Sequence, residues 1–215
     1  MGELSTKQKI IQAAIHLFNE HGVVNVRLQQ IADKIGISVG NLAYHFKNKE
    51  ILIETIHETL YEQISEVLQW YRVYPNLMDF DQQLTKYFLL LQKFPFYFLD
   101  LQEIKRNYPN IHTQRKPLIN KMISQIRKRF DFNIQRGLIV KEPRVGIYDS
   151  ISNAIWVLMT FWTPRYLEDE NGTIVSEKKF KAEIWHQMYP YFTEKGIAEF
   201  EQLIEPLLKY PSSEK

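Results

Sequence analysis

The chain has 215 residues, a formal net charge of only +2, 45% hydrophobic residues and no cysteine. This composition excludes a disulfide scaffold and thiolate chemistry, and it is typical of a folded globular protein rather than a disordered one. The chain has no apolar run of about 18 residues, and residues 4–12 are too polar for the core of a signal peptide, so we expect a cytoplasmic protein without a membrane span.

The first predicted element is an amphipathic helix over residues 7–20, which Ser5 or Thr6 can cap. Its apolar residues recur at the spacing of one helical face. They are Ile10, Ala13, Ala14, Leu17 and Phe18. A turn at His21-Gly22 ends the helix.

Residues 27–46 predict two short helices joined by a tight turn. Residues 27–35 form the first, and Gly36 follows where a helix end in the left-handed region favours glycine. Ser38 can cap the second helix, which extends to about residue 46 and has Leu42 and Phe46 on its apolar side. Such a short connection is typical of a helix-turn-helix, whose second helix enters the major groove of DNA.

A long helix over about residues 48–71 follows, with Asn48 as its cap and apolar residues at helical spacing from Ile53 to Tyr71. This helix is long enough to connect two units. We therefore predict a DNA-binding domain at residues 1–50 and a second domain at residues 51–215. All nine prolines lie at or after Pro75, in this second part.

The rest of the chain predicts further helices and almost no strand pattern, which indicates an all-α fold. The predicted helices cover residues 79–93, 95–106, 115–136, 147–165, 177–192 and 197–209.

The stretch from residue 22 to residue 52 resembles the TetR family of bacterial transcriptional regulators. The residues that carry the likeness are Ile31-Ala32, Gly36-Ile37-Ser38, Gly40-Asn41-Leu42, Tyr44-His45-Phe46, Lys47-Asn48-Lys49-Glu50 and Leu52. The likeness covers about residues 6–53, and it departs from the family at Ala43, where a second tyrosine is usual, and at Arg27, where Thr or Ser is frequent. It implies an N-terminal three-helix helix-turn-helix domain and a C-terminal helical domain for ligand binding and dimerisation.

The predicted DNA-facing residues lie on the polar side of the two short helices and at the start of the long one. They are Arg27, Gln29, Ser38, Val39, Gly40, Asn41, Tyr44, His45 and Lys49. Asn41 can pair with adenine or serve a phosphate, whereas Tyr44 and His45 can donate to phosphate oxygens. Lys49 is expected to favour a phosphate at a helix N-terminus. The alternative is a solvated polar face on an ordinary three-helix unit.

Residues 151–162 are apolar nearly all round, in one stripe of Ile151, Ile155, Leu158 and Trp162 and another of Ala154, Val157 and Phe161. A helix with two apolar faces must bury both, either in a monomer core or partly against a partner. The family resemblance implies that this helix and the helix at residues 177–192 form a four-helix interface with a second copy. The predicted interface residues are Ile151, Ile155, Leu158, Trp162, Phe180, Ile184, Met188 and Tyr191.

Aromatic residues are frequent between residues 70 and 132. They can line a small-molecule cavity, or they can simply form part of the hydrophobic core. The resemblance implies a cavity, for which we predict the lining Trp70, Tyr87, Phe88, Leu91, Phe94, Phe98, Phe130 and Trp156. Residues 105–136 hold nine Lys or Arg and one acid. Such a run of charge is usually a solvated face; the alternatives are that it attracts an anionic effector or adds a contact to DNA.

Motifs of enzymes are absent from the sequence: it has no Gly-x-Ser-x-Gly, P-loop, dinucleotide fingerprint or His-Glu-x-x-His, and His16 with Glu20 is a weak metal pair. We expect no catalytic site, cofactor or metal. The prediction is a dimeric repressor that binds a palindromic operator in double-stranded DNA and is released by a small organic ligand, without a membrane partner. The alternatives are an architectural or protein-recruiting DNA-binding module without an effector, and a helical enzyme with a converted DNA-binding unit.

Overall fold

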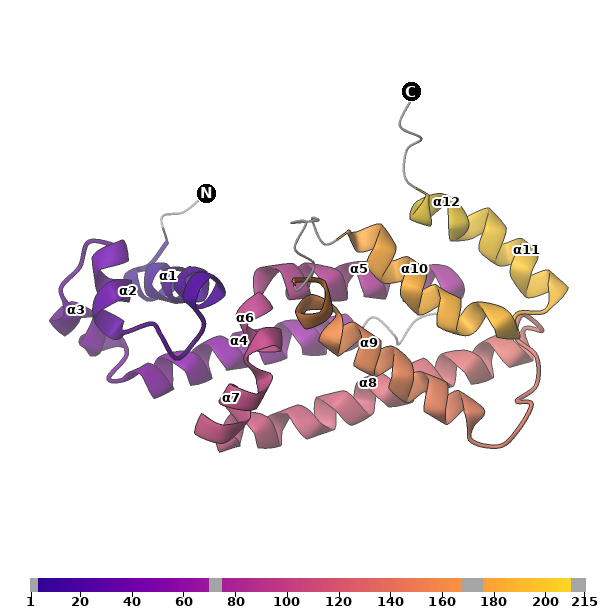
Figure 1. The fold of residues 1–215 in the computed structure, drawn as a ribbon, viewed down its shortest axis with the longest axis horizontal. Helices are drawn as coiled ribbons and strands as arrows, with labels where there is room; N and C mark the ends of the chain where they lie inside the picture. The colour runs from indigo at the N-terminus through magenta and orange to yellow at the C-terminus, as the bar shows by residue number, and fades with distance from the viewer. Residues whose placement is uncertain (1–3, 70–74, 168–175, 210–215) are drawn as a thin grey trace, which may run out of the picture. The chain divides into compact units, whose positions relative to one another are not determined.

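The computed structural model describes residues 4–69, 75–167 and 176–209, and these form two compact units. Unit 1 consists of residues 1–63 and 92–115, and unit 2 of residues 64–91 and 116–215. The regular structure of the described residues is helical, with one isolated antiparallel bridge between Ile139 and Phe192 (Figure 1). None of the described helices is both long and apolar enough to span a membrane.

Unit 1 is built on a cluster of three helices, drawn in indigo to purple in Figure 1. They are α1 (Thr6–His21), α2 (Leu28–Lys34) and α3 (Val39–His45). Ser5 caps α1 in a capping box, because its Oγ accepts from the Gln8 N–H at 3.3 Å while Gln8 Oε1 accepts from the Ser5 N–H at 2.9 Å. The predicted apolar faces form the core of the cluster. Its fully buried members are Ile10, Ala14, Phe18, Ile31, Ala32, Leu42 and Phe46.

The boundary between the units differs from the predicted one at residue 50. The long helix α4 (Lys49–Gln69) is continuous, but its residues up to 63 belong to unit 1. Unit 1 also contains α6 (Pro95–Leu99), α7 (Leu101–Asn107) and the start of α8 (Pro109–Gln135). These helices join unit 1 because α6 packs on α1, where the rings of Phe96 and Phe18 lie 5.4 Å apart.

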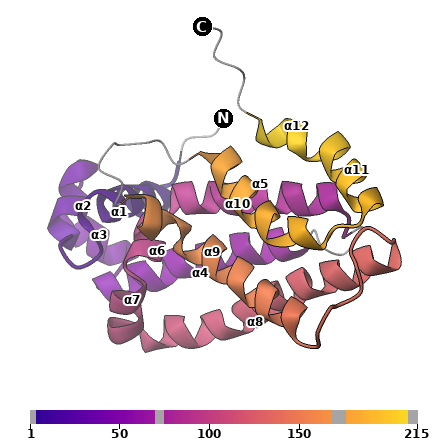
Figure 2. The ribbon, with the colours of Figure 1, turned by 45° about the vertical axis from the view of Figure 1, so that its right-hand side comes forward.

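Unit 2 contains the end of α4 and the remaining helices. These are α5 (Leu77–Lys93), most of α8, α9 (Ile147–Leu167), α10 (Glu177–Met188), the 3-10 turn Tyr189–Tyr191, α11 (Glu194–Leu203) and α12 (Glu205–Leu208). Figure 2 shows α10 beside α9, with which it packs. The helices predicted at 95–106, 177–192 and 197–209 are interrupted at Asp100, at the 3-10 turn around Pro190 and before Pro206. At Pro190 and Pro206 the backbone nitrogen has no hydrogen to donate, which favours the start of a new helical segment at these two positions.

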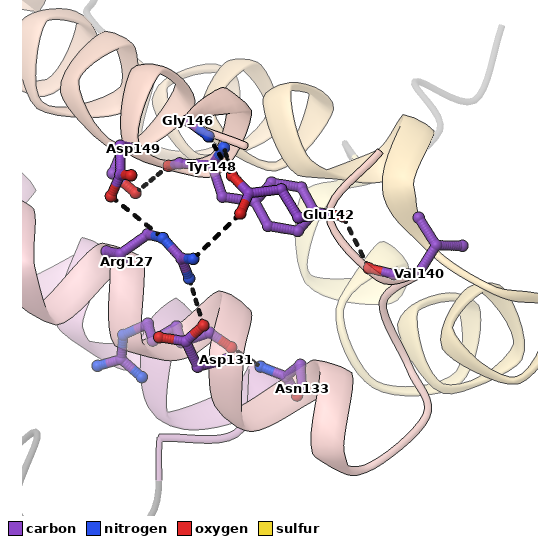
Figure 3. Close-up of polar contacts among 10 residues, drawn as sticks. Arg127, Asp131, Asn133, Val140, Glu142, Gly146, Tyr148 and Asp149 are labelled. Carbon is purple, nitrogen blue, oxygen red and sulfur yellow. Dashed lines mark hydrogen bonds and ion pairs between the residues drawn. The ribbon is translucent and has the colours of Figure 1, made fainter. Parts of the chain in front are cut away.

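The basic segment at residues 105–136 does not form a uniform charged face, because three of its arginines pair with acids. Arg129 Nη1 lies 2.6 Å from Asp79 Oδ2, and Arg136 Nη2 lies 2.9 Å from Glu199 Oε2. Arg127 contacts the carboxylates of Asp131, Glu142 and Asp149 (Figure 3). The fold therefore pairs three of the nine basic residues of this segment with acids.

Glu142, one of the acids that Arg127 contacts, also holds the start of α9. Glu142 Oε1 accepts from the N–H groups of Gly146 at 3.1 Å and Tyr148 at 2.8 Å, so a loop carboxylate occupies the helix N-terminus (Figure 3). The Tyr148 hydroxyl donates to the Val140 carbonyl at 2.8 Å, and its ring stacks on Phe130 with centroids 4.4 Å apart. The loop between α8 and α9 is thus closed by side chains from both helices.

Candidate nucleic-acid interface

The connection between α2 and α3 has the geometry that the sequence predicts. Gly36 has φ of +69°, in the left-handed region that favours glycine. Ser38 caps α3, where its Oγ accepts from the Asn41 N–H at 3.1 Å. Leu42 and Phe46 are buried against the other two helices. Their burial turns the opposite side of α3 toward solvent.

The outward side of α3 carries a surface that the fold does not use. The side chain of Tyr44 is 86% exposed, and its ring lies edge-on to His45 with centroids 5.3 Å apart. Ser38, Gly40 and Asn41 are exposed, whereas Val39 and His45 are partly covered. The helix therefore presents a mixed set of donors, acceptors and one apolar side chain.

Two predicted residues lie at the start of α2. Arg27 is exposed, and its backbone N–H donates to Gln30 Oε1 at 2.7 Å. Gln29 is exposed, and its side-chain amide donates to Asp33 Oδ1 at 2.6 Å. The arrangement leaves the Arg27 guanidinium on the surface of unit 1, next to the helix-turn-helix.

Lys49 does not point outward as the sequence analysis expected. Its ammonium donates to the carbonyl oxygen of Val23, approaches that of Val24 at 3.4 Å, and lies 6.0 Å from the centre of the Phe18 ring. Burial lowers the pKa of Lys49, and the nearby carboxylate of Glu50 partly offsets this. The inward direction of the Lys49 side chain has a local cause, since the carbonyl oxygens of the turn between α1 and α2 accept its ammonium. Lys47, which is exposed directly after α3, was not among the predicted residues.

The turn between α1 and α2 is held from a second side by a residue that the sequence analysis missed. The carboxylate of Asp100, at the junction of α6 and α7, accepts from the Val23 N–H at 2.9 Å. Asn19 adds two bonds to the same region, to the Lys93 carbonyl at 3.2 Å and from the Phe96 N–H at 3.3 Å. No local pattern could reveal these contacts, because their partners lie more than 70 residues apart in sequence.

Most of the predicted dimer-interface residues lie inside unit 2 instead. Ile155, Trp162, Phe180, Ile184 and Met188 are each at most 1% exposed. The rings of Trp162 and Phe180 contact each other edge-on at 5.3 Å, so this stripe of α9 faces the subunit's own core. Ile151, Leu158 and Tyr191 are partly exposed.

The outward side of α9 is the other apolar stripe. Val157 is 45% exposed and Phe161 43% exposed, and Ala154 is also exposed. The sequence identified both stripes, and the one that it assigned to the partner is mostly buried within unit 2, because two equally apolar faces carry no signal of direction.

The predicted pocket residues pack as core in the part of the chain that the structure describes. Tyr87, Phe88, Leu91 and Phe130 are buried in unit 2, and Phe94 and Phe98 are buried in unit 1. Trp156 is partly exposed, and Trp70 lies outside the described residues. Phe88, for example, contacts Phe180 with ring centroids 5.5 Å apart.

Two hollows occur elsewhere on the described residues. One in unit 2, of about 360 Å³, is lined by Ala182, His186, Tyr189, Phe200, Glu201, Glu205, Leu208 and Lys209. One in unit 1, of about 380 Å³, is lined by Glu54, His57, Glu58, Asn110, Ile111 and Thr113. Neither is lined by any predicted pocket residue. The described residues hold no group of three or more His, Cys, Asp or Glu placed to bind a metal.

Family models match most of the chain. The model described as "Bacterial regulatory proteins, tetR family" matches residues 10–56, and that described as "Bacterial transcriptional repressor" matches residues 59–200. The probable HTH-type transcriptional regulator YttP of Bacillus subtilis is 36% identical over 67 residues, which are 31% of this chain and 32% of that protein. The chain thus matches about a third of the length of the first curated relatives.

Solved structures share the fold over nearly the whole chain. A TetR-family transcriptional regulator from Marinobacter aquaeolei VT8 has a TM-score of 0.81 at 24% identity, covering 93% of this chain and 99% of that one. A gamma-butyrolactone receptor, an ArpA-like protein, has a TM-score of 0.68 at 18% identity, covering 93% and 94%. At these identities the likeness establishes the common fold.

Proposed function

Since the chain belongs to the TetR family of bacterial transcriptional regulators and is a helix-turn-helix regulator rather than an enzyme, we propose that it is a repressor. In this proposal a homodimer binds a palindromic operator through α3, and a small organic ligand releases it. The observation that carries the proposal is the exposed, mixed polar surface of α3, which belongs to a three-helix cluster whose α1–α2 turn is held by Asp100 and Lys49. The cytoplasm, where bacterial DNA lies, is the proposed location.

The side chains of α3 match the chemistry of a major groove. The Asn41 amide can bond to the N6 and N7 groups of adenine, and Val39 can contact a thymine methyl. Tyr44 and His45 can donate to phosphate oxygens, and Arg27 and Gln29 supply backbone contacts from α2. With Lys49 turned inward, Lys47 is the better candidate for a phosphate contact at this end of α3.

Gly40 supports a close approach to α3. A Cβ built on Gly40 would meet only Ser38 Oγ, at 3.8 Å, so packing does not require glycine there. Glycine within a helix is less stable than alanine by about 1 kcal/mol. A glycine that packing does not require supports a close approach of the DNA to this part of α3.

The homodimer is proposed through the outward stripe of α9 rather than the stripe chosen from the sequence. Ala154, Val157 and Phe161 give this stripe an apolar surface. Two recognition helices roughly one DNA turn apart can read both halves of a palindrome.

The proposed effector is a small organic ligand. A ligand can shift the operator-bound population only by binding one of two states more tightly. The shared fold with a gamma-butyrolactone receptor supports a small organic ligand. The second candidate is an architectural or protein-recruiting module without an effector, in which the buried aromatic residues of unit 2 would serve only as core.

The test is selection of bound duplexes from a random pool with the purified chain, followed by titrations at several salt concentrations. The proposal expects a palindromic consensus and an affinity that falls steeply with salt. Asn41→Ala should change the base preference at one position of each half-site by roughly 1–3 kcal/mol. Enrichment of no sequence above the input pool would overturn operator binding, whereas selective binding that no small molecule relieves would favour the architectural module.

A further inference from the structure

The C-terminal end of α4 lies in the core of unit 2, where its last carbonyl groups need partners. The last four carbonyls of an α-helix have no partner within the helix. Val67 and Leu68 are 7% and 1% exposed, and α4 ends at Gln69. A buried carbonyl without a hydrogen bond is costly, so side chains from other helices must reach this end.

Two glutamine side chains supply those hydrogen bonds. Gln83 of α5 donates its amide to the Val67 carbonyl at 3.2 Å, and Gln125 of α8 donates to the Leu68 carbonyl at 2.8 Å. The two amides are also joined to each other, since Gln83 Nε2 lies 3.3 Å from Gln125 Oε1. Both glutamines are at least 92% buried, which is unusual for this residue type.

An ion pair fixes the direction of these amides. Arg129 of α8, 1% exposed, donates to Gln83 Oε1 at 2.8 Å and to Asp79 Oδ2 at 2.6 Å. Because the guanidinium only donates, it holds the Gln83 oxygen toward itself and turns the Gln83 NH₂ group toward α4. The hydrogen bonds therefore lead in one direction, from the guanidinium through two amides to the end of α4.

We propose that Gln83 and Gln125 are positioning residues for DNA binding, which set the register of the α4 end against α5 and α8. Helix α4 continues without a break from this end to Lys49, directly after the helix-turn-helix. In this proposal a change at the two amides displaces α4 and with it the helix-turn-helix, and in the proposed homodimer it alters the separation of the two α3 helices. This inference rests on the proposed operator binding.

The experiment compares Gln125→Met, Gln83→Met and the double variant with the unchanged chain. Methionine keeps much of the volume and the unbranched shape of glutamine but removes the amide. Gln135→Met is the matched control, because Gln135 lies on the same helix and is exposed. Each protein is titrated, well below its unfolding temperature, with operators whose half-sites are moved closer or further apart by one and two base pairs.

For each operator pair we compare the ratio of the affinities at two half-site spacings. In Gln125→Met and in Gln83→Met we expect this ratio to differ at least fivefold from that of the unchanged chain. In the double variant the change should be smaller than the product of the two single changes. Gln135→Met should retain the original profile. A lowered unfolding temperature with an unchanged spacing profile would show that the amides only stabilise the fold, and it would overturn the inference while leaving operator binding intact. Failure of the unchanged chain to bind any spacing would instead overturn the proposed function, and the inference with it. Should Gln83→Met not fold, Gln125→Met, which leaves the bond between Arg129 and Gln83 in place, decides the question.

Discussion

Three glycines of the described residues serve three different purposes, which the atoms around them reveal. Gly36 serves a positive φ, as its place after a periodic helix predicts. Gly196 serves a close contact instead, because a Cβ there would lie 2.0 Å from the Leu138 carbonyl oxygen. Gly40 serves neither purpose within the fold, and this is why we connect it with DNA.

Gly40→Ala should separate stability from DNA binding. We expect the free energy of unfolding to stay equal or rise by up to about 1 kcal/mol, because alanine favours a helix. Operator affinity should fall at least tenfold, as the methyl group would stand between α3 and the DNA. Chemical denaturation and titration with labelled operator measure the two quantities, and an unchanged affinity would remove Gly40 from the interface.

Gly196→Ala should have the opposite profile. The added methyl group meets a backbone oxygen that cannot move like the end of a side chain, so the free energy of unfolding should fall by about 3 kcal/mol. Operator affinity, measured where the variant is still folded, should change little. Stability equal to that of the unchanged chain would show that the loop at Leu138 yields easily.

Tyr148 should make the folded chain sensitive to alkali. Burial raises the pKa of Tyr148 to about 12, with smaller contributions from Tyr191 and Glu142, against an unfolded value near 10. Between these two values the unfolded chain has lost the proton and the folded chain has kept it. The free energy of unfolding should therefore fall by about 2–3 kcal/mol as pH rises from about 10 to 12.

The measurement for Tyr148 is the free energy of unfolding against pH, in the unchanged chain and in Tyr148→Phe. The difference between the two curves removes the titration of other groups. The difference in the free energy of unfolding between the two proteins should shrink above pH 10, because only the unchanged chain has a phenol whose ionisation then favours unfolding. Tyr148→Phe lacks the hydrogen bond to Val140 at every pH. Parallel curves would contradict the raised pKa.

At the scale of elements, α5 is tied to two other helices by alternate polar residues. Asp79 and Gln83 bond to α8, as described above, whereas Asp81 faces α10. Asp81 is 2% exposed, and its carboxylate lies 2.6 Å from the Lys181 ammonium and accepts from the Trp185 indole at 3.1 Å. Helical periodicity predicted α5 correctly but gave no indication of these partners, which are about 50 residues away in α8 and about 100 residues away in α10.

Removal of one member of this pair should be costly. Asp81→Asn leaves the buried Lys181 ammonium with the more distant carboxylate of Glu177, 3.5 Å away, as its remaining acid, so we expect the free energy of unfolding to fall by about 3 kcal/mol. The double variant Asp81→Asn with Lys181→Met should recover part of the loss. The exposed pair of Glu205 and Lys209, 3.2 Å apart, gives the control, because Glu205→Gln should cost less than about 1 kcal/mol. Equal losses at both pairs would show that the burial of Asp81 is not the cause.

At the scale of the whole molecule, the proposed dimer depends on which face of α9 remains uncovered. Phe161→Glu places a charge on the outward stripe, and it should shift sedimentation from a species of about 51 kDa, twice the 25.7 kDa chain, toward the monomer. The unfolding temperature of the monomer should change little, because Phe161 is 43% exposed. Trp162→Glu is the contrast, and it should unfold the chain because Trp162 is 1% exposed. A Phe161→Glu chain that sediments like the unchanged dimer would exclude this face.

The sequence by itself determined the helix-turn-helix, because its signals are local: a cap at Ser38, a glycine at Gly36 and apolar residues three and four apart. It also determined the all-α class and the family. Only the tertiary structure decided that Lys49 turns inward, that the predicted stripe of α9 faces its own core, and that α6 and α7 belong with the DNA-binding unit. Each of these depends on partners that folding brings together from distant parts of the chain, such as Asp100 at Val23 or Phe180 at Trp162. Periodicity reports that a face is buried, but the identity of what covers it is a property of the packed molecule.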